Sequence, residues 1–216
     1  MIPVLIIPIL NRYDLLDASL HTIDYPINEI LIINNGKEIY EPKRKDLNIK
    51  VLNLPSNLGM SGSWNLGIKL YPHEKYWMFS SADINWISGA LEKFDTQTGS
   101  NNLIVSTEGW STFSVGENVI RTIGLFDEYF YPIYFEDNDY YERYMRSDLK
   151  DNYRDSIQVE SPVGNSQTIN SDPQLKNRNG ETFSKNEKYF NEKKSQDFNI
   201  NGLWNIDRRR DQEWLR

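Results

Sequence analysis

An apolar run that ends in small residues and a carboxylate constrains this chain more than any other feature. Residues 76–79 are Tyr, Trp, Met and Phe, a combination typical of a buried β-strand. Two serines and an alanine separate this run from Asp83. Ligands of open α/β sheets bind just outside the carboxyl ends of the strands, so Asp83 stands where a ligand or a metal ion would bind. Taken alone, Asp83 could equally cap a helix or form an Asx-turn.

Three further apolar runs precede this one, and a segment with helical spacing lies between the first two. Residues 4–10 and 30–33 are predicted to form buried strands, and residues 49–54 are predicted to form a third strand. Asp14 is expected to cap a helix over residues 15–23, where apolar side chains recur at helical spacing. This order of strands and helices predicts an α/β fold with a mostly parallel sheet and helices on its faces.

The composition limits the classes of function. The chain has 216 residues, enough for one sizeable α/β domain, and its net charge of −7 argues against a general nucleic-acid binder. It has no cysteine, and therefore no disulfide framework and no thiolate metal site. The apolar run at residues 2–10 is too short to span a membrane, and no basic segment precedes it. We therefore expect a cytoplasmic protein with no transmembrane segment.

The turns after the first two predicted strands carry polar side chains. A dinucleotide-binding fold would have Gly-x-Gly-x-x-Gly after its first strand, whereas this chain has Asn11 and Arg12 there. No P-loop motif occurs in the sequence either, so nicotinamide-dependent oxidoreductases and P-loop enzymes are disfavoured. Asn34 and Asn35 precede Gly36 after the second strand, where they could form only a tight turn or could also hydrogen-bond a nucleobase.

A glycine-rich segment follows the third predicted strand. Residues 57–67 include Asn57 and Gly59, and a helix is expected to begin near Ser61. Glycine lets the backbone approach a ligand closely, and a helix N-terminus favours a phosphate group. On its own the segment is an ordinary loop and helix. Together with Asp83, it provides half of a nucleotide pocket.

An acidic cluster lies in the second half of the chain. Glu136, Asp137 and Asp139 fall within four residues. Acidic side chains are stabilised by the dipole at a helix N-terminus, so the cluster can be a plain helix start. A carboxylate at such a position can also be aimed at a substrate as a general base. Both interpretations can hold together.

The order and spacing of these motifs resemble glycosyltransferase family 2, whose members have the GT-A fold. The resemblance is to the rhamnosyltransferase-like branch, including members of phage or viral type, and it covers about residues 2–150. In the first half of the chain, the matching segments are residues 9–12, Asn34–Gly36 and the two Asn-x-Gly segments at 57–59 and 65–67. Ser81–Ile84 then stands at the place of the family's Asn-Pro-Asp-Val motif. In the second half, residues 124–130 resemble Gly-Gly-Phe-Asp-Glu-x-Phe, and residues 136–139 resemble Glu-Asp-x-Asp.

The resemblance implies a fold, a domain organisation and a reaction. The fold is a single-domain GT-A fold, with a Rossmann-like, mixed but mostly parallel sheet flanked by helices. Residues 1–150 would form the nucleotide-sugar-binding and catalytic core, and residues 151–216 an acceptor-side or lid segment packed on the same domain. The reaction would be inverting transfer of a sugar from a nucleotide diphosphate donor, with UDP or dTDP favoured, to a hydroxyl of a glycan or other acceptor.

The resemblance also implies roles for individual residues. Mn²⁺ or Mg²⁺ bound to Asp83 would stabilise the departing diphosphate. Asp137 would be the base that takes the acceptor proton, with Glu136 and Asp139 supporting acceptor binding or geometry. The expected nucleotide contacts are Asn11, Arg12, Asn34, Asn35, Asn57, Gly59 and Ser81.

Two departures from the family pattern motivate an alternative function. Ser81 stands where a full Asp-x-Asp motif has its first acid, and residues 157–162 lack the histidine that binds the metal in many relatives, with Glu160 as a poor substitute. The alternative is a catalytically inactive module that binds a nucleotide sugar or a glycan. The acidic cluster at residues 136–139 argues against it, because a binding module needs no base. A sugar-nucleotide pyrophosphorylase is disfavoured, since its early glycine-rich, basic loop is missing.

The last part of the chain is more polar than the rest. Residues 164–188 are rich in Asn, Ser, Lys and Glu, which predicts a loop or a mobile lid. Residues 189–194 are interpreted as an amphipathic helical turn, with a loose resemblance to a late aromatic-x-x-Lys segment of the family. Apolar residues between positions 203 and 215 could dock a final helix on the domain.

Overall fold

The computed structural model describes residues 1–164 and 167–198 and has a seven-stranded sheet at its centre. The strands are β1 (Ile2–Ile9), β2 (Ile27–Asn34), β3 (Ile49–Asn53), β4 (Tyr76–Ser80), β5 (Leu103–Ser106), β6 (Gly109–Gly116) and β7 (Tyr153–Ile157). The helices are α1 (Tyr13–His21), α2 (Gly59–Leu70), α3 (Ala90–Gln97), α4 (Glu117–Ile123), α5 (Glu136–Met145), a 3-10 turn (Lys150–Asn152), α6 (Gln167–Asn170) and α7 (Pro173–Ser195).

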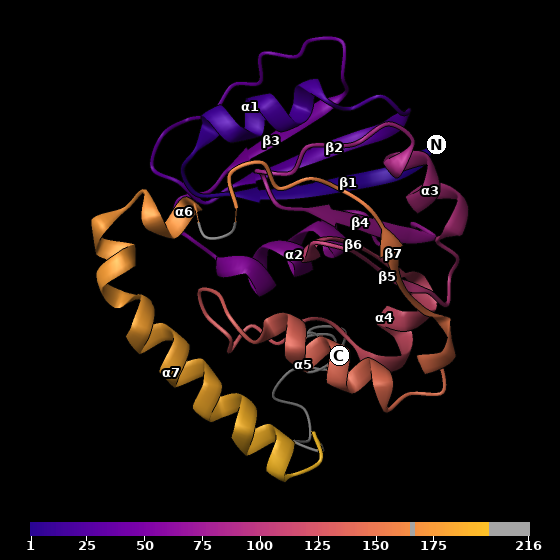
Figure 1. Cartoon of the computed structure of the whole chain (residues 1–216), viewed down its shortest axis with the longest axis vertical. Helices are drawn as coiled ribbons and strands as arrows, with labels where there is room; N and C mark the ends of the chain where they lie inside the picture. Colours follow the sequence, from indigo (N-terminus) through magenta and orange to yellow (C-terminus); the bar gives the residue numbers. More distant parts are fainter. Residues whose placement is uncertain (165–166, 199–216) are drawn as a thin grey trace, which may run out of the picture.

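The strand order confirms the predicted α/β fold with a mixed, mostly parallel sheet. The order is β3-β2-β1-β4-β6-β5-β7. The strands from β3 to β4 are parallel, β6 is antiparallel to both of its neighbours, and β7 is parallel to β5. The carboxyl ends of β1, β2, β3 and β4 therefore meet at one edge of the sheet. Figure 1 shows α6 and α7 along this edge, at the opposite end of β1 from the N-terminus.

Burial on both faces explains why the central strands are continuously apolar. In β1, Leu5 and Ile7 contribute to one core cluster, whereas Val4 and Ile6 contribute to the other, and all four are fully buried. Successive side chains of a strand point to opposite faces, so a strand that is covered on both sides must be apolar at every position. This is the pattern that identified the strands in the sequence.

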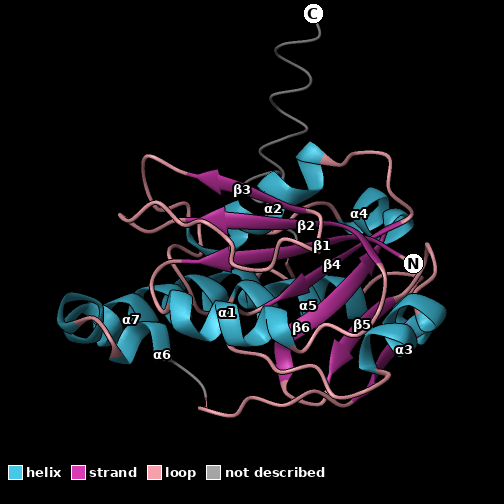
Figure 2. Ribbon diagram, turned by 90° about the horizontal axis from the view of Figure 1, so that it is seen from above, coloured by secondary structure: helices cyan, strands magenta, loops and turns pink. Residues whose placement is uncertain are grey.

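The helices form one layer on each face of the sheet. Apolar residues of α1 and α3 belong to the first core cluster, and those of α2, α4 and α5 belong to the second. Figures 1 and 2 show α1 on the face of the sheet opposite to α2 and α5. These layers do not cover the carboxyl edge of the sheet, where the loops and α6 and α7 lie.

Aromatic residues dominate the second core cluster. The ring of Trp64 on α2 lies 5.0 Å from that of Phe113 and 4.8 Å from that of Phe126, measured between centroids. Of the aromatic residues near the motifs, Trp86 and Tyr140 are buried in the core, whereas Tyr131 is half exposed. Trp86 and Tyr140 thus serve core packing, whereas Tyr131 does not.

Two local predictions are wrong. Asp14 does not cap α1, because its carboxylate instead accepts hydrogen bonds from the Arg12 guanidinium, and Arg12 itself is the N-cap residue in a left-handed conformation. Residues 164–188 are not a loop, because most of them lie in α6 and α7. The side chain of Asp172 accepts hydrogen bonds from the backbone amides of Gln174 and Leu175, and Pro173 opens the helix, which together form a strong helix start.

The polar composition of α7 has a simple cause. Of its 23 residues only Asn186, Tyr189 and Lys193 are buried, so the helix carries almost no apolar stripe.

Residues 189–194 are helical, as predicted. The apolar residues at positions 203–215 lie outside the described residues. Among the helices that the structure describes, none combines the length and the apolar character that crossing a membrane requires.

Replacing Trp64 tests the aromatic core. Trp64→Ala should lower the free energy of unfolding by about 3–5 kcal/mol, because it leaves a cavity among Phe79, Phe113 and Phe126. Ile39→Ala is the control, since that side chain is 79% exposed and its loss should cost no more than about 0.5 kcal/mol. Urea denaturation measures both. Equal midpoints for the two variants would contradict the proposed importance of this cluster.

Candidate active site

The turn after β1 brings the first predicted site residues to the carboxyl edge. The Asn11 side-chain amide donates to the carbonyl of Thr168, 3.0 Å away, so α6 lies directly on this turn. Arg12 has a φ of 51°, and its guanidinium donates to Asp14 and approaches Gln167 and Ser171. The hydrogen bond with Asp14 is the main cause that raises the pKa of Arg12, and the charge of Asp83 adds to it.

Asp83 follows the end of β4, the strand that pairs with β1, and the positive charge of Arg12 affects its pKa. Its side chain is half-buried, and loss of solvent raises its pKa, an effect that its own backbone amide and Arg12 partly oppose. A cation would favour the ionised form of this carboxylate. Within residues 1–164 and 167–198, no three His, Cys, Asp or Glu residues are grouped as a metal site. A lone carboxylate such as that of Asp83 can hold a Mg²⁺-type ion only where phosphate and water supply the other ligands.

The neighbours of Asp83 are set by backbone pairing. The amide of Ser81 donates to the carbonyl of Ser111 at 2.6 Å, which holds the start of the turn against β6. Asn85 and Glu160 exchange two backbone hydrogen bonds in an isolated antiparallel bridge. The bridge brings Glu160, whose side chain is exposed, opposite the segment that follows Asp83.

Asn34 and Asn35 are committed to hydrogen bonds inside the protein. Asn34 is fully buried, accepts from the Tyr13 hydroxyl and the Gly36 amide, and donates to Asn53 and to the carbonyl of Glu38. Asn35 is 8% exposed and links the end of β2 to α2, through the Ser63 hydroxyl and the Leu58 amide. A nucleotide could bind either side-chain amide only if some of these bonds were broken.

The glycine-rich turn also uses its polar groups within the protein. The Asn57 side chain accepts from the amide of Gly59, which has a φ of +71°, and a Cβ at Gly59 would lie 2.8 Å from the carbonyl oxygen of Pro132. The next amide, that of Met60, donates to the same carbonyl. The amides of Gly59 and Met60 are therefore occupied, and Pro132 of the loop before α5 lies against the helix N-terminus that we expected to bind phosphate. The helix begins at Gly59, two residues earlier than predicted.

The three acids at the start of α5 have different environments. Glu136 is 4% exposed, one of its carboxylate oxygens has no hydrogen-bond partner, and burial together with the charge of Asp137 raises its pKa well above the ordinary value. Asp137 is half-buried and accepts from the amide of Asn138, and burial raises its pKa less strongly. Asp139 is fully buried and forms ion pairs with Arg143 and Lys193.

These environments separate the chemical roles. Glu136 is held in its neutral form over a range of pH in which an exposed glutamate is ionised. Asp139 is neutralised by its two cations. Asp137 is thus the carboxylate of the cluster that keeps contact with solvent and makes no ion pair with a described residue. Among these three acids, Asp137 is therefore the one that a ligand from solvent could reach.

Several functional candidates escaped the sequence analysis. Asp127 is fully buried and binds Lys193 and Tyr189 of α7, and Asn186 binds the loop before α5. Asp127 lies in the segment that resembles Gly-Gly-Phe-Asp-Glu-x-Phe, so that motif was the available signal. For Lys193 the available signal was the loose resemblance of residues 189–194 to the late aromatic-x-x-Lys segment of the family.

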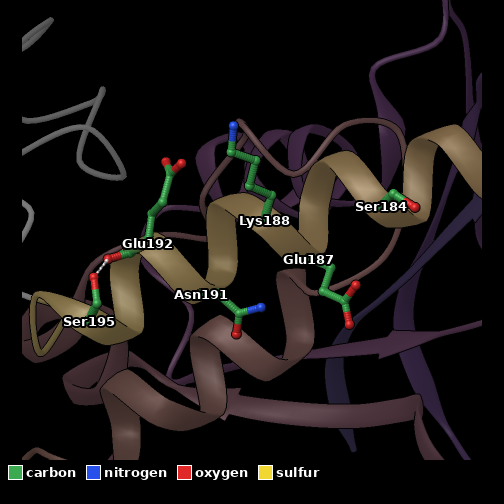
Figure 3. Close-up of a pocket in the computed structure, with 6 residues that line it drawn as sticks. All are labelled: Ser184, Glu187, Lys188, Asn191, Glu192 and Ser195. Carbon is green, nitrogen blue, oxygen red and sulfur yellow. Dashed lines mark hydrogen bonds between the residues drawn. The ribbon is translucent and has the colours of Figure 1, made fainter.

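The outer face of α7 carries an open, polar hollow that is separate from these residues. Its lining residues all come from this one helix and are Ser184, Glu187, Lys188, Asn191, Glu192 and Ser195. Figure 3 shows them spaced along successive turns of α7. Since none of the predicted site residues lines the hollow, we assign the candidate active site to the carboxyl edge of the sheet.

Comparison with known proteins identifies the family of this chain. Residues 4–141 match the family described as Glycosyl transferase family 2. No curated protein matches the chain in sequence. The structure is similar to that of glucosyl-3-phosphoglycerate synthase from Mycobacterium tuberculosis in complex with Mn²⁺, UDP and glucosyl-3-phosphoglycerate, with a TM-score of 0.52 and 10% identity over 76% of this chain and 72% of that one.

A second similar structure is S. aureus TarS. Residues 1–349 of TarS give a TM-score of 0.51 and 13% identity over 76% of this chain. The chain spans 59% of that fragment, and 33% of the longer TarS structure, to which it is 17% identical with a TM-score of 0.51. At these identities the similarity shows the fold.

Glu136→Gln tests the burial of this acid through the pH dependence of stability. Because the folded protein retains the proton of Glu136 after the unfolded chain has released it, wild-type stability should fall as pH rises above the ordinary pKa of 4.5. Relative to wild type, the variant should gain up to about 1.4 kcal/mol per pH unit in that range. Denaturation at a series of pH values measures this difference.

The matched control is Glu187→Gln on the exposed face of α7. That variant should follow the wild-type curve within about 0.5 kcal/mol at every pH. A Glu136→Gln curve parallel to wild type above pH 4.5 would show that Glu136 ionises freely in the folded protein.

Proposed function

We propose that this chain, which belongs to glycosyl transferase family 2, transfers a sugar from a nucleotide diphosphate donor to an acceptor hydroxyl with inversion at the anomeric carbon. The observation that carries the proposal is the position of Arg12 and Asp83 just beyond the carboxyl ends of the paired parallel strands β1 and β4, in a fold whose acidic helix carries Asp137. The proposed donors are UDP- and dTDP-sugars. The proposed acceptor is a glycan or another hydroxyl compound.

The donor side of the reaction would use Asp83 and Arg12. Asp83 is the residue that would hold Mn²⁺ or Mg²⁺, and a bound cation would supply positive charge to the departing diphosphate. Arg12 adds a fixed positive charge on the same side, as its effect on Asp83 indicates. The M. tuberculosis synthase has been seen with Mn²⁺ and UDP, which makes UDP with Mn²⁺ the first combination to test.

The acceptor side would use Asp137 as the general base. As the acceptor oxygen bonds to the anomeric carbon, the bond from that carbon to the diphosphate breaks, and Asp137 takes the proton of the hydroxyl. A single displacement of this kind needs no covalent nucleophile and inverts the anomeric centre. Burial raises the pKa of Asp137 toward neutral pH, and a general base is most effective when its pKa lies near the pH at which the enzyme works.

The neighbours of Asp137 support this choice of base. Glu136 is held in its neutral form by burial, and Asp139 is neutralised by Arg143 and Lys193. The acidic cluster thus presents one ionised carboxylate to the acceptor.

The two Asn-x-Gly segments, at residues 57–59 and 65–67, favour the rhamnosyltransferase-like branch of the family, and a cytoplasmic location is part of the same proposal.

A catalytically inactive binding module is the second candidate. It is favoured by Ser81 at the place of an acid, and by the single carboxylate at the proposed metal position. Such a module would bind the nucleotide and leave the sugar attached. The two functions are separated by asking whether Asp137 matters for turnover.

Calorimetric titration of UDP, dTDP, GDP, CDP and ADP tests the donor proposal. We expect UDP or dTDP to bind with the highest affinity, and binding to weaken when Mn²⁺ is replaced by a chelator, because Asp83 offers an oxygen ligand for the cation. Asp83→Ala should remove most of the metal dependence. Asp155→Ala, an exposed position on β7, is the control. If none of the five nucleotides bound, both the transferase and the nucleotide-binding module would be ruled out.

Asp137→Asn tests the general base. Turnover of the donor should fall by about 10²–10⁴-fold, the usual contribution of a general base, while the Kd for the nucleotide stays unchanged. Asp148→Asn is the matched control, since Asp148 is exposed in the loop after α5. Unchanged turnover in Asp137→Asn would remove Asp137 from the mechanism. Sugar release that is undetectable in the wild type, despite tight nucleotide binding, would favour the inactive module.

A further inference from the structure

A lysine on the polar helix α7 is completely buried. Lys193 has an exposed fraction of 0%, and its ammonium group lies 2.8 Å from a carboxylate oxygen of Asp127 and in contact with the carboxylate of Asp139. The same group lies over the rings of Phe130 and Tyr189, 5.4 and 5.5 Å from their centroids. A buried charge is costly unless it is paired and hydrogen-bonded, and Lys193 meets both conditions.

The cluster around Lys193 is balanced in charge. Two buried carboxylates, of Asp127 and Asp139, face two buried cations, of Lys193 and Arg143. Burial raises the pKa of Tyr189, so its hydroxyl stays protonated and donates to Asp127 over 2.9 Å. Removal of one member leaves an uncompensated charge in the interior.

Asp127 and Arg143 of the cluster also bind backbone near the acidic helix. Asp127 accepts from the amide of Tyr129, which holds the loop before α5. Arg143 binds Asp139 at 2.8 Å and donates to the carbonyls of Ile123 and Leu125, at 2.7 and 3.0 Å. Asp139 lies two residues after Asp137 on the same helix, so the ion pairs fix the first turn of α5.

A second contact from α7 holds the residues just before this turn. The Asn186 side-chain amide donates to the carbonyls of Ile133 and Tyr134, at 2.8 and 3.2 Å. Tyr134 and Phe135 have φ values of 84° and 71°, a left-handed conformation that non-glycine residues seldom adopt. Such residues keep this conformation only where their surroundings impose it. Asn186 and Lys193 are seven residues apart and therefore lie on the same face of α7.

We propose that α7 is a positioning element of the active site and that Lys193 is its positioning residue, acting through Asp127 and Asp139 to set the orientation of Asp137. Asn186 acts in the same way on the left-handed residues before α5. This inference rests on the proposed role of Asp137 as the base. It extends the catalytic unit beyond residues 4–141, which match the family, to a helix at residues 173–195.

Four variants separate positioning from stability. Lys193→Met removes the charge and Lys193→Arg retains it. Lys193→Met combined with Asp127→Asn restores the charge balance without restoring the contact. Asn186→Ala removes the second contact without any change in charge, and Lys194→Met on the exposed side of α7 is the control. Each is assayed for the Kd of UDP with Mn²⁺, for the release of UDP from UDP-glucose, and for amide hydrogen exchange at residues 133–139.

Positioning predicts a loss of rate without a loss of donor affinity. Lys193→Met should release UDP about 100-fold more slowly, the effect of a displacement of about 1 Å at a catalytic group, with an unchanged Kd for UDP. Exchange at residues 133–139 should become faster. Lys193→Arg should recover most of the rate, and Asn186→Ala should lose part of it. The charge-balanced double variant should regain thermal stability but not the rate.

Other results would overturn the inference. If the double variant regained rate and stability together, Lys193 would be only a structural residue. Wild-type rates and exchange in Lys193→Met, or in Asn186→Ala if Lys193→Met does not fold, would also contradict it. If the wild type binds neither UDP nor dTDP, with or without Mn²⁺, the proposed function fails. Hydrogen exchange at residues 133–139 then still decides whether α7 fixes the start of α5.

Discussion

Strand β1 is covered by helices on both of its faces, and this constraint decides where polar chemistry can take place in the molecule. A strand buried on both sides cannot carry a functional side chain along its length without a burial penalty. Polar groups are therefore displaced to its end, at Asn11 and Arg12, and to the end of β4, at Asp83. The parallel arrangement of these strands brings both ends to one edge, where Arg12 and Asp83 influence each other's pKa.

The cost of burying charge also separates the acids of α5. Glu136 avoids this cost by retaining its proton, whereas the charge of Asp139 is compensated by two cations. Asp137 lies between them, with partial access to solvent and a pKa raised to a smaller extent. Three acids that look alike in the sequence therefore have three different electrostatic environments, and the differences come from their surroundings alone.

Helix α7 is stabilised by different interactions from those that stabilise the helices covering the sheet. Those helices bury apolar stripes, whereas α7 buries one lysine, one tyrosine and one asparagine. Its contacts reach from the ion pairs around Lys193 to the loop before α5, and α6 beside it reaches the turn after β1. The segment from 167 to 195 thus touches both the donor side and the acceptor side of the proposed site.

The sequence by itself determined the buried parts of β1, β2 and β4, because a strand segment covered on both faces must be apolar at every position, and that pattern is local. It also placed Asp83 after a strand and Glu136 at a helix start, since strand ends and helix starts are local as well. Only the tertiary structure decided that Asn34 turns inward, and that Lys193 pairs with Asp127, 66 positions away. Composition made α7 look like a loop because its stability comes from such distant contacts, which leave no periodic pattern in the neighbouring residues.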